Sequence, residues 1–388
     1  MSLRFHWMLP KSGEVVPGRK QTPAEALRYR VESTGRSSPA RVPRLDGWTH
    51  FARHAEDAGI DSVLISFSRY EPDNIAIATA LGLATERLRY MLAYRSGLMQ
   101  PTTFVQQINT LSAMIGGRLS LNIVAGSSGP EQRGYGDFLA HDERYARADE
   151  FLQICRAFWR EEGDVDFKGR YYNVESGRLG TPFVAQGRRE PEIYISGHSE
   201  QSEQLARAHG SCWLRVVDTP EKLAPSVATM RAADINVCLR LCILCRPTRH
   251  EALRALEDLL ADDKIGRRER AALRDSQLHT NLTKDSSQMH AEASARAGTG
   301  AHWLNDSLFT GFVGHYGPVW TLLVGSPREL ADTFLAYRRI GVTEFILSGM
   351  PELDEVDRFG REVLPLVREG ETLAERSRDR ETSAAASS

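Results

Sequence analysis

The sequence predicts an α/β protein built as a (β/α)8 barrel, the TIM barrel fold. Short apolar runs alternate with amphipathic stretches along most of the 388 residues, as expected when each parallel strand is followed by a covering helix. Eight such units can be counted, and eight is the number that closes a barrel. Barrels of this kind reach this length as one unit, so we expect a single domain over residues 1–370.

The eight predicted strands are short and apolar. They cover residues 3–9, 62–66, 88–93, 119–125, 192–196, 212–217, 235–245 and 343–348. Amphipathic stretches between them predict helices at 45–58, 102–114, 144–159 and 220–233. Gly59 comes after the first of these helices and is typical of a residue that ends one.

Two intervals are too long for simple connections between strands and helices. Residues 126–140 are rich in glycine, and residues 263–320 change from charged helical material to small polar residues. Because long insertions at barrel ends are usually lids or binding loops, we expect a lid at 263–320, with a surface excursion of no function as the alternative. Residues 371–388 are charged and then rich in Ser and Ala, which predicts a disordered tail.

Charge and composition exclude several classes of partner. The 49 Lys and Arg residues nearly balance the 51 Asp and Glu residues, so the surface lacks the field that holds nucleic acid or an anionic membrane. There is no apolar run of about 18 residues and no secretory signal at the start. Five cysteines form no disulfide framework. We therefore expect a cytoplasmic protein without nucleic-acid or membrane partners.

Several common catalytic machineries are missing from the sequence. It contains no P-loop, no G-x-G-x-x-G after a strand, no H-E-x-x-H and no G-x-S-x-G. Cys238, Cys242 and Cys245 invite a zinc interpretation, but alternation along a strand puts Cys245 on the opposite face from the other two. No metal site is predicted.

The same alternation directs Arg240 into the barrel, together with Cys238 and Cys242. A buried arginine is costly unless it meets an anion or a carboxylate. Arg240 could equally form an ion pair with an inward-facing acidic residue or contact a substrate or cofactor.

Two segments at strand ends are suited to an anionic ligand. Ser196, Gly197, His198 and Ser199 precede a helix that begins near residue 200, and backbone amides at such a helix start can cradle a phosphate. A helix capped by Ser199 is the alternative. His141 and Tyr145 are four residues apart and share one face of a helix, although an ordinary helix start with a buried tyrosine would show the same pattern.

The order of these segments resembles the bacterial luciferase-like flavin monooxygenases, and within them most the alkanesulfonate monooxygenase branch. The resemblance runs from about residue 3 to 367. It rests on the segments at 5–10, 92–95, 101–103, 117–127, 141–145, 194–199, 239–241 and 347–349.

This resemblance implies a two-component enzyme that oxidises a small organic substrate with O2. Its FMN would be used in the reduced form, FMNH2, supplied by a separate NAD(P)H-dependent flavin reductase, and the enzyme would form a homodimer or homotetramer. The resemblance places the flavin among Ser66, Ala93, Asn122, His141 and Tyr145, with Ser196, Gly197, His198 and Ser199 at its phosphate end.

On the substrate side the sequence departs from the alkanesulfonate enzymes. Arg240 is retained, but Cys242 replaces a histidine, Tyr70 or Glu71 replaces a cysteine, and Met350 replaces a tyrosine. The lid arginine aligns near Thr299, with Arg296 close by. We take Arg240, Cys242, Tyr70 and His198 as candidate catalytic residues, and Arg240, Met350 and Arg296 as candidate substrate contacts. The substrate is then larger or less charged than a simple alkanesulfonate, with Arg240 retained for one anionic group.

Hydroxylation, C–S cleavage and Baeyer–Villiger insertion all remain open. An F420-dependent oxidoreductase of the same fold is the first alternative. A catalytically silent flavin-binding subunit is the second, although the insertion at 263–320 argues against it.

Overall fold

A computed structural model describes most of the chain. The described residues are 2–32, 42–126, 129–160, 162–185, 187–263, 299–313 and 318–386. Most of the expected lid at 263–320, including Arg296, lies outside them.

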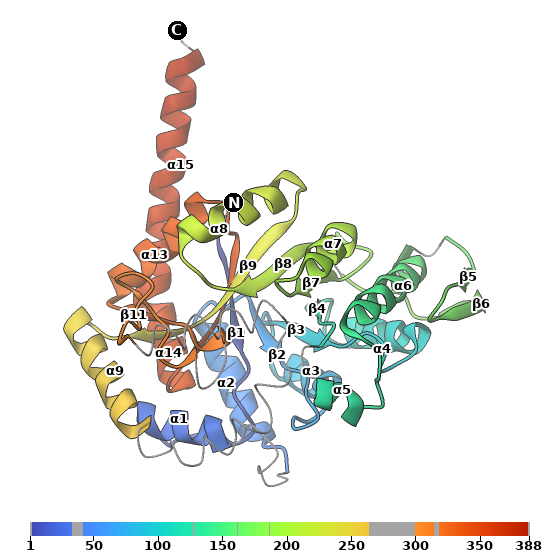
Figure 1. The fold of residues 1–388 in the computed structure, drawn as a ribbon, viewed down its shortest axis with the longest axis horizontal. Coiled ribbons are helices and arrows are strands. Elements are labelled where there is room, and N and C mark those ends of the chain that lie inside the picture. The colour runs from blue at the N-terminus through green and yellow to red at the C-terminus, as the bar shows by residue number, and fades with distance from the viewer. Residues whose placement is uncertain are drawn as a thin grey trace.

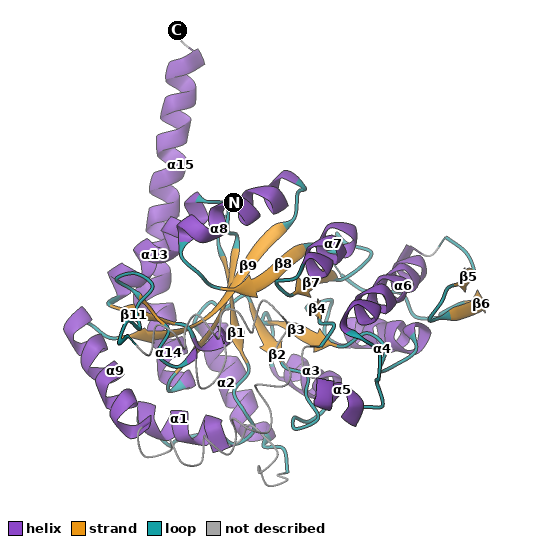
Figure 2. Cartoon of the chain, viewed as in Figure 1, coloured by secondary structure: helices purple, strands orange, loops and turns teal. Residues whose placement is uncertain are grey.

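Eight parallel strands form a closed barrel, which confirms the predicted fold (Figures 1 and 2). These are β1 (Arg4–Met8), β2 (Ser62–Ile65), β3 (Arg89–Tyr94), β4 (Leu119–Ile123), β7 (Glu192–Ser196), β8 (Cys212–Val216), β9 (Asn236–Cys245) and β12 (Glu344–Gly349). Neighbours pair in the order β12, β1, β2, β3, β4, β7, β8, and β9 closes the ring by pairing with both β8 and β12. Each strand overlaps one of the eight predicted from the sequence.

Helices surround the barrel on its outer side (Figure 2). They are α2 (Leu45–Asp57), α3 (Asn74–Ala84), α4 (Pro101–Met114), α6 (His141–Arg160), α7 (Glu200–His209), α8 (Pro220–Ala232), α13 (Pro327–Arg339) and α14 (Glu352–Arg358). Local capping explains several of their starts. Asp73 caps α3, and Ser326 with Glu329 forms a capping box on α13.

The structure adds elements that the sequence pattern did not predict. They are α1 (Pro23–Glu32), α5 (Gly129–Gly134), the antiparallel hairpin of β5 (Val165–Lys168) and β6 (Asn173–Gly177), α9 (Arg249–Asp263), β10 (Leu308–Phe309) and β11 (Leu322–Gly325). The last of these pairs in parallel with the far half of β9, from Cys242 to Cys245. The ten-residue strand β9 therefore pairs with three strands, β8, β11 and β12.

A helix runs through most of the segment for which the sequence predicts a disordered tail. After a π-helical turn at Phe359–Val363, α15 (Leu364–Ala386) continues far past residue 371 and projects from the barrel (Figure 1). Its inner part is anchored: Glu371 is buried and accepts a hydrogen bond of 2.5 Å from the amide of Leu3. The segment has few apolar residues, but its Ala, Glu and Arg are strong helix formers.

The main core lies between the barrel and its helices. Phe5 on β1 points outward and packs on Phe334 of α13, with ring centroids 5.2 Å apart, and on Phe345 and Phe359. All four rings are fully buried. Within the described ranges, every helix is too short or too polar to cross a bilayer.

Replacing Phe334 tests this packing. Phe334→Ala removes the ring that joins α13 to β1, and we expect it to lower the free energy of unfolding by about 3–5 kcal/mol. Urea denaturation measures the change. Phe138→Ala is the matched control, because Phe138 is 76% exposed and its loss should cost little. Equal effects of the two substitutions would contradict the proposed core.

Candidate functional site

The predicted site residues come from the carboxyl ends of the barrel strands and the loops after them. Binding residues of TIM barrels gather at this end, which we call the mouth. Two groups form there. One lies over β4, β7 and the starts of α6 and α7, and the other lies over β9 and β12.

The first group is built around the turn between β7 and α7. Ser199 caps α7 by accepting a hydrogen bond of 3.2 Å from the amide of Ser202. Gly197 has φ of +148°, and a Cβ there would lie 2.6 Å from Ser202 Cβ and 2.9 Å from the Tyr145 hydroxyl oxygen. Glycine is therefore required for the backbone to lie against both residues. The result is a cradle at a helix N-terminus, suited to an anion.

His141 brings an unsatisfied polar atom to the same region. Its ring lies 5.1 Å from the ring of Tyr145, and its Nδ1 lies 2.9 Å from Asp142 Oδ1. Its Nε2 is buried and has no hydrogen-bond partner among the described residues. Because buried polar atoms normally have partners, this nitrogen is free to hydrogen-bond to a ligand.

His198 is held as a neutral ring. Burial, together with the charge of Arg215, lowers its pKa to about 4. The amide of Val216 donates a hydrogen bond of 3.3 Å to its Nε2, so the proton resides on Nδ1. A neutral ring with one fixed proton favours hydrogen-bond donation over proton transfer near pH 7.

The remaining predicted flavin contacts lie along β2, β3 and β4. Ser196 donates a hydrogen bond of 2.6 Å to Asn122 Oδ1, which joins β7 to β4 at the mouth. Ala93 lies opposite Asn122 in the register of β3 and β4. Ser66 comes directly after β2 and is half-buried.

The second group contains Arg240, Cys242 and Met350. The nearest hydrogen-bond partner of Arg240 is the sulfur of Met8, at 3.7 Å, and no described carboxylate forms an ion pair with it. Burial lowers the pKa of this guanidinium. The Cys242 sulfur lies 3.0 Å from the Ser348 hydroxyl, and burial raises the pKa of its thiol, so it is protonated. Met350 is fully buried in the same cluster as Cys242.

Tyr70 lies apart from both groups, at the rim. Its side chain is 37% exposed, and its hydroxyl accepts a hydrogen bond of 2.6 Å from Arg69. The neighbouring Glu71 forms an ion pair with Lys11.

Sequence reasoning missed a buried charged network beside the second group. Arg30 of α1 donates to Glu14 at 2.5 Å, to Glu352 at 2.6 Å and to the Gly349 carbonyl at 2.9 Å. Glu352 also accepts from Trp7 Nε1 at 2.5 Å and from the Gly349 amide at 2.7 Å. Burial raises the pKa of Glu352 to about 7, after the lowering effect of Arg30 and the smaller raising effect of Glu14 are included. No motif in the sequence marks these residues.

A second hydrogen-bonded network lies inside the barrel, below the mouth. His6 hydrogen-bonds to Ser62 through Nδ1, at 2.7 Å, and to Glu344 through Nε2, at 2.9 Å. Glu344 also accepts from Tyr194 at 2.6 Å and forms an ion pair with Arg4. Burial alone would raise the pKa of Glu344, but these partners outweigh burial and hold it at about 2. The network is complete without a further group.

Fold and mouth together define a TIM-barrel protein with an anion cradle after its fifth barrel strand. The model of the family described as Luciferase-like monooxygenase matches residues 21–344. The chain therefore belongs to the luciferase-like monooxygenase family.

Solved structures with the same fold include enzymes of differing chemistry. A riboflavin lyase (RcaE), solved with modified FMN and its substrate riboflavin, is 21% identical, with a TM-score of 0.71 over 95% of this chain and 92% of that chain. EDTA monooxygenase (EmoA) from Chelativorans sp. BNC1 is 19% identical, with a TM-score of 0.71 over 95% and 94%. An F420-dependent secondary alcohol dehydrogenase is 18% identical, with a TM-score of 0.60 over 95% and 99%. At these identities the likeness shows the fold alone.

The Glu352 network predicts a particular dependence of stability on pH. Because the folded-state pKa is raised from 4.5 to about 7, the folded state binds the extra proton in this interval. Stability from this group therefore falls as pH rises from about 4.5 to 7 and then levels off. Glu352→Gln removes the titration, so its unfolding free energy should fall less than that of the wild type over this range.

Urea denaturation at pH 5, 6, 7 and 8 measures this difference. Asp354→Asn, on the exposed side of the same helix, should retain the wild-type pH dependence. If the difference in unfolding free energy between the wild type and Glu352→Gln is the same at every pH, Glu352 does not titrate in this pH range.

Proposed function

We propose that this protein is the oxygenase component of a two-component system, which uses FMNH2 and O2 to oxidise a small organic molecule. The observation that carries the proposal is the cradle formed by Gly197, Ser199 and Tyr145 at the mouth of a luciferase-like barrel. A backbone turn that only glycine allows, at the start of a helix, suits a phosphate group.

The proposed flavin site uses both hydrogen-bonding groups and open backbone. Ser196, Gly197, His198 and Ser199 would hold the phosphate, with His198 donating from Nδ1. His141 would donate or accept at its unsatisfied Nε2, and Asn122, Ser66 and Ala93 would lie along the flavin ring. When bound, reduced flavin supplies the electrons that allow O2 to react. A separate flavin reductase is proposed as the source of FMNH2, because the sequence has no nicotinamide-binding fingerprint.

The substrate side favours a molecule with one anionic group and an apolar body. Arg240 lacks an ion-pair partner in the described part of the chain, so an anionic group would offset the cost of burying its charge. Cys242 is a neutral thiol and Met350 an apolar wall. These residues support a sulfur-containing or anionic substrate other than a simple alkanesulfonate.

An F420-dependent oxidoreductase is the second candidate. The specific observation in its favour is the similar barrel of the F420-dependent alcohol dehydrogenase. F420 also carries phosphate, so the cradle alone does not separate the two cofactors.

Anaerobic titration separates these candidates. We expect FMNH2 to bind at least about tenfold more tightly than oxidised FMN or reduced F420, and the bound FMNH2 to consume oxygen on rapid mixing with O2. Flavin fluorescence, absorbance and an oxygen electrode provide the measurements. Preference for reduced F420 without oxygen consumption would identify a dehydrogenase. Binding of flavin without oxygen consumption would identify a silent subunit, and absence of binding to either cofactor would contradict both candidates.

The cradle is tested by Gly197→Ala. The added Cβ would press on Ser202 and Tyr145, so we expect binding of FMNH2 to weaken by about tenfold or more. Gly163→Ala is the matched control, because Gly163 has a similar φ of +138° but no atom within 4 Å of the added Cβ. Both variants share the backbone strain, and only the first alters the cradle. Equal affinities in the two variants would argue against flavin phosphate at this turn.

A further inference from the structure

Helix α2 carries two histidines one turn apart, on the outside of the barrel and away from the mouth residues described above. The ring centroids of His50 and His54 lie 4.5 Å apart, and both rings are partly exposed. Residues at i and i+4 share one face of a helix. This is the spacing with which two histidines of an H-E-x-x-H helix bind zinc. Phe51 stands where that motif has its catalytic glutamate, so the pair has the ligands but not the base.

A carboxylate from a second helix meets this pair. His54 Nδ1 lies 2.9 Å from Asp357 Oδ1 on α14, and both side chains are 36% exposed. The chain is tightly packed just beyond the ends of these two helices, since a Cβ added at Gly360 would lie 2.6 Å from the backbone oxygen of Ala58. His54 and Asp357 therefore stand on a rigid frame.

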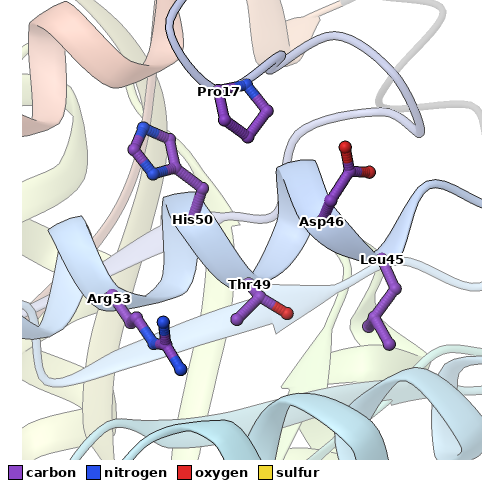
Figure 3. A pocket seen from close by; sticks show the side chains of 6 residues that line it. All are labelled: Pro17, Leu45, Asp46, Thr49, His50 and Arg53. Carbon is purple, nitrogen blue, oxygen red and sulfur yellow. The ribbon is translucent and has the colours of Figure 1, made fainter.

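The surroundings of His50 leave room for an ion and its water. His50 and Asp46 rise on the same side of α2 beneath Pro17, while Arg53 leaves on the other side (Figure 3). The cleft that these residues line has a volume of about 460 Å³.

We propose that His50, His54 and Asp357 form a binding site for a divalent transition-metal ion such as Zn²⁺, with water completing its coordination. Two imidazoles and one carboxylate are a ligand set that suits Zn²⁺, Ni²⁺ and Cu²⁺. His54 and Asp357 already touch, so the proposal requires only the His50 side chain to rotate toward them.

This site is distinct from the one described group whose ligand atoms already lie within 4.8 Å of one another, namely His6, Cys238 and Glu344. There, hydrogen bonds already occupy both nitrogens of His6 and the carboxylate of Glu344. At the surface site, His50 and His54 are instead partly exposed, and a cleft lies beside His50.

Metal binding at this site would fasten α2 to α14. The first residue of α14 is Glu352, which accepts a hydrogen bond from the Gly349 amide at the end of β12. An ion bound by His54 and Asp357 would therefore brace the helix that supports one side of the mouth. The site needs no flavin, so its test is independent of the proposed function.

The test is metal titration of the full chain without an affinity tag, after treatment with EDTA and dialysis. We expect one Zn²⁺ site by competition with a chromogenic chelator. His50→Gln and His54→Gln should each weaken it by about tenfold or more, and Asp357→Asn should weaken it as well. His250→Gln, an exposed histidine on α9, and Asp354→Asn on α14 are the matched controls and should bind as the wild type does.

Two further readouts distinguish a lost ligand from a damaged fold. Circular dichroism should show equal melting of the metal-free wild type and His50→Gln, because His50 makes no hydrogen bond or ion pair within the described residues. Electron paramagnetic resonance of bound Cu²⁺ should show two nitrogen ligands in the wild type and one in His50→Gln. Zn²⁺ binding that is unchanged in the double variant His50→Gln/His54→Gln, or absent from the wild type, would overturn the proposal.

Discussion

The carboxylate of Glu344 holds the inside of this barrel together. It sits on β12 and accepts hydrogen bonds from His6 on β1 and Tyr194 on β7, beside the charge of Arg4. An ionised group in this position would be costly, but its partners outweigh burial and keep its pKa at about 2. The strands on opposite sides of the barrel are thereby joined through one charge. Leu64, Met91, Leu214 and Ile346 belong to the apolar cluster inside the barrel.

At the mouth, two sides have contrasting chemistry. Over β4 and β7 the site is made from a glycine turn, hydroxyl groups and the neutral ring of His198, which suits an anion without a fixed positive charge. Over β9 and β12 a buried arginine stands beside a protonated thiol and an apolar methionine. The Arg30 network braces this second side through Gly349 and Glu352. Under the proposed function, the first side would hold the cofactor and the second would contact the substrate.

Local periodicity in the sequence was enough to predict the strands and the faces of their side chains. Alternation along residues 235–245 correctly directed Cys238 and Arg240 inward, because side chains of a strand alternate whatever its partners are. The alternation could not predict whether Arg240 forms an ion pair with an acidic side chain, since that depends on residues far away in the sequence. Arg30 and Glu352 are 322 positions apart, and no local sequence pattern predicts such a contact. Composition also does not predict the helix at residues 371–386, where helix propensity and the contact of Glu371 with Leu3 act against the polar composition.

The burial of Arg240 also bears on what the chain oxidises. A guanidinium buried in the barrel loses its hydration, and within the described residues only the sulfur of Met8 lies within hydrogen-bonding distance of Arg240. A structural ion pair would have removed this cost within the protein. No such pair forms within the described residues, and under the proposed function an anionic group of the substrate would be the favourable partner. Cys242 and Met350 add no charge beside it, which supports the proposal that the rest of the substrate is apolar.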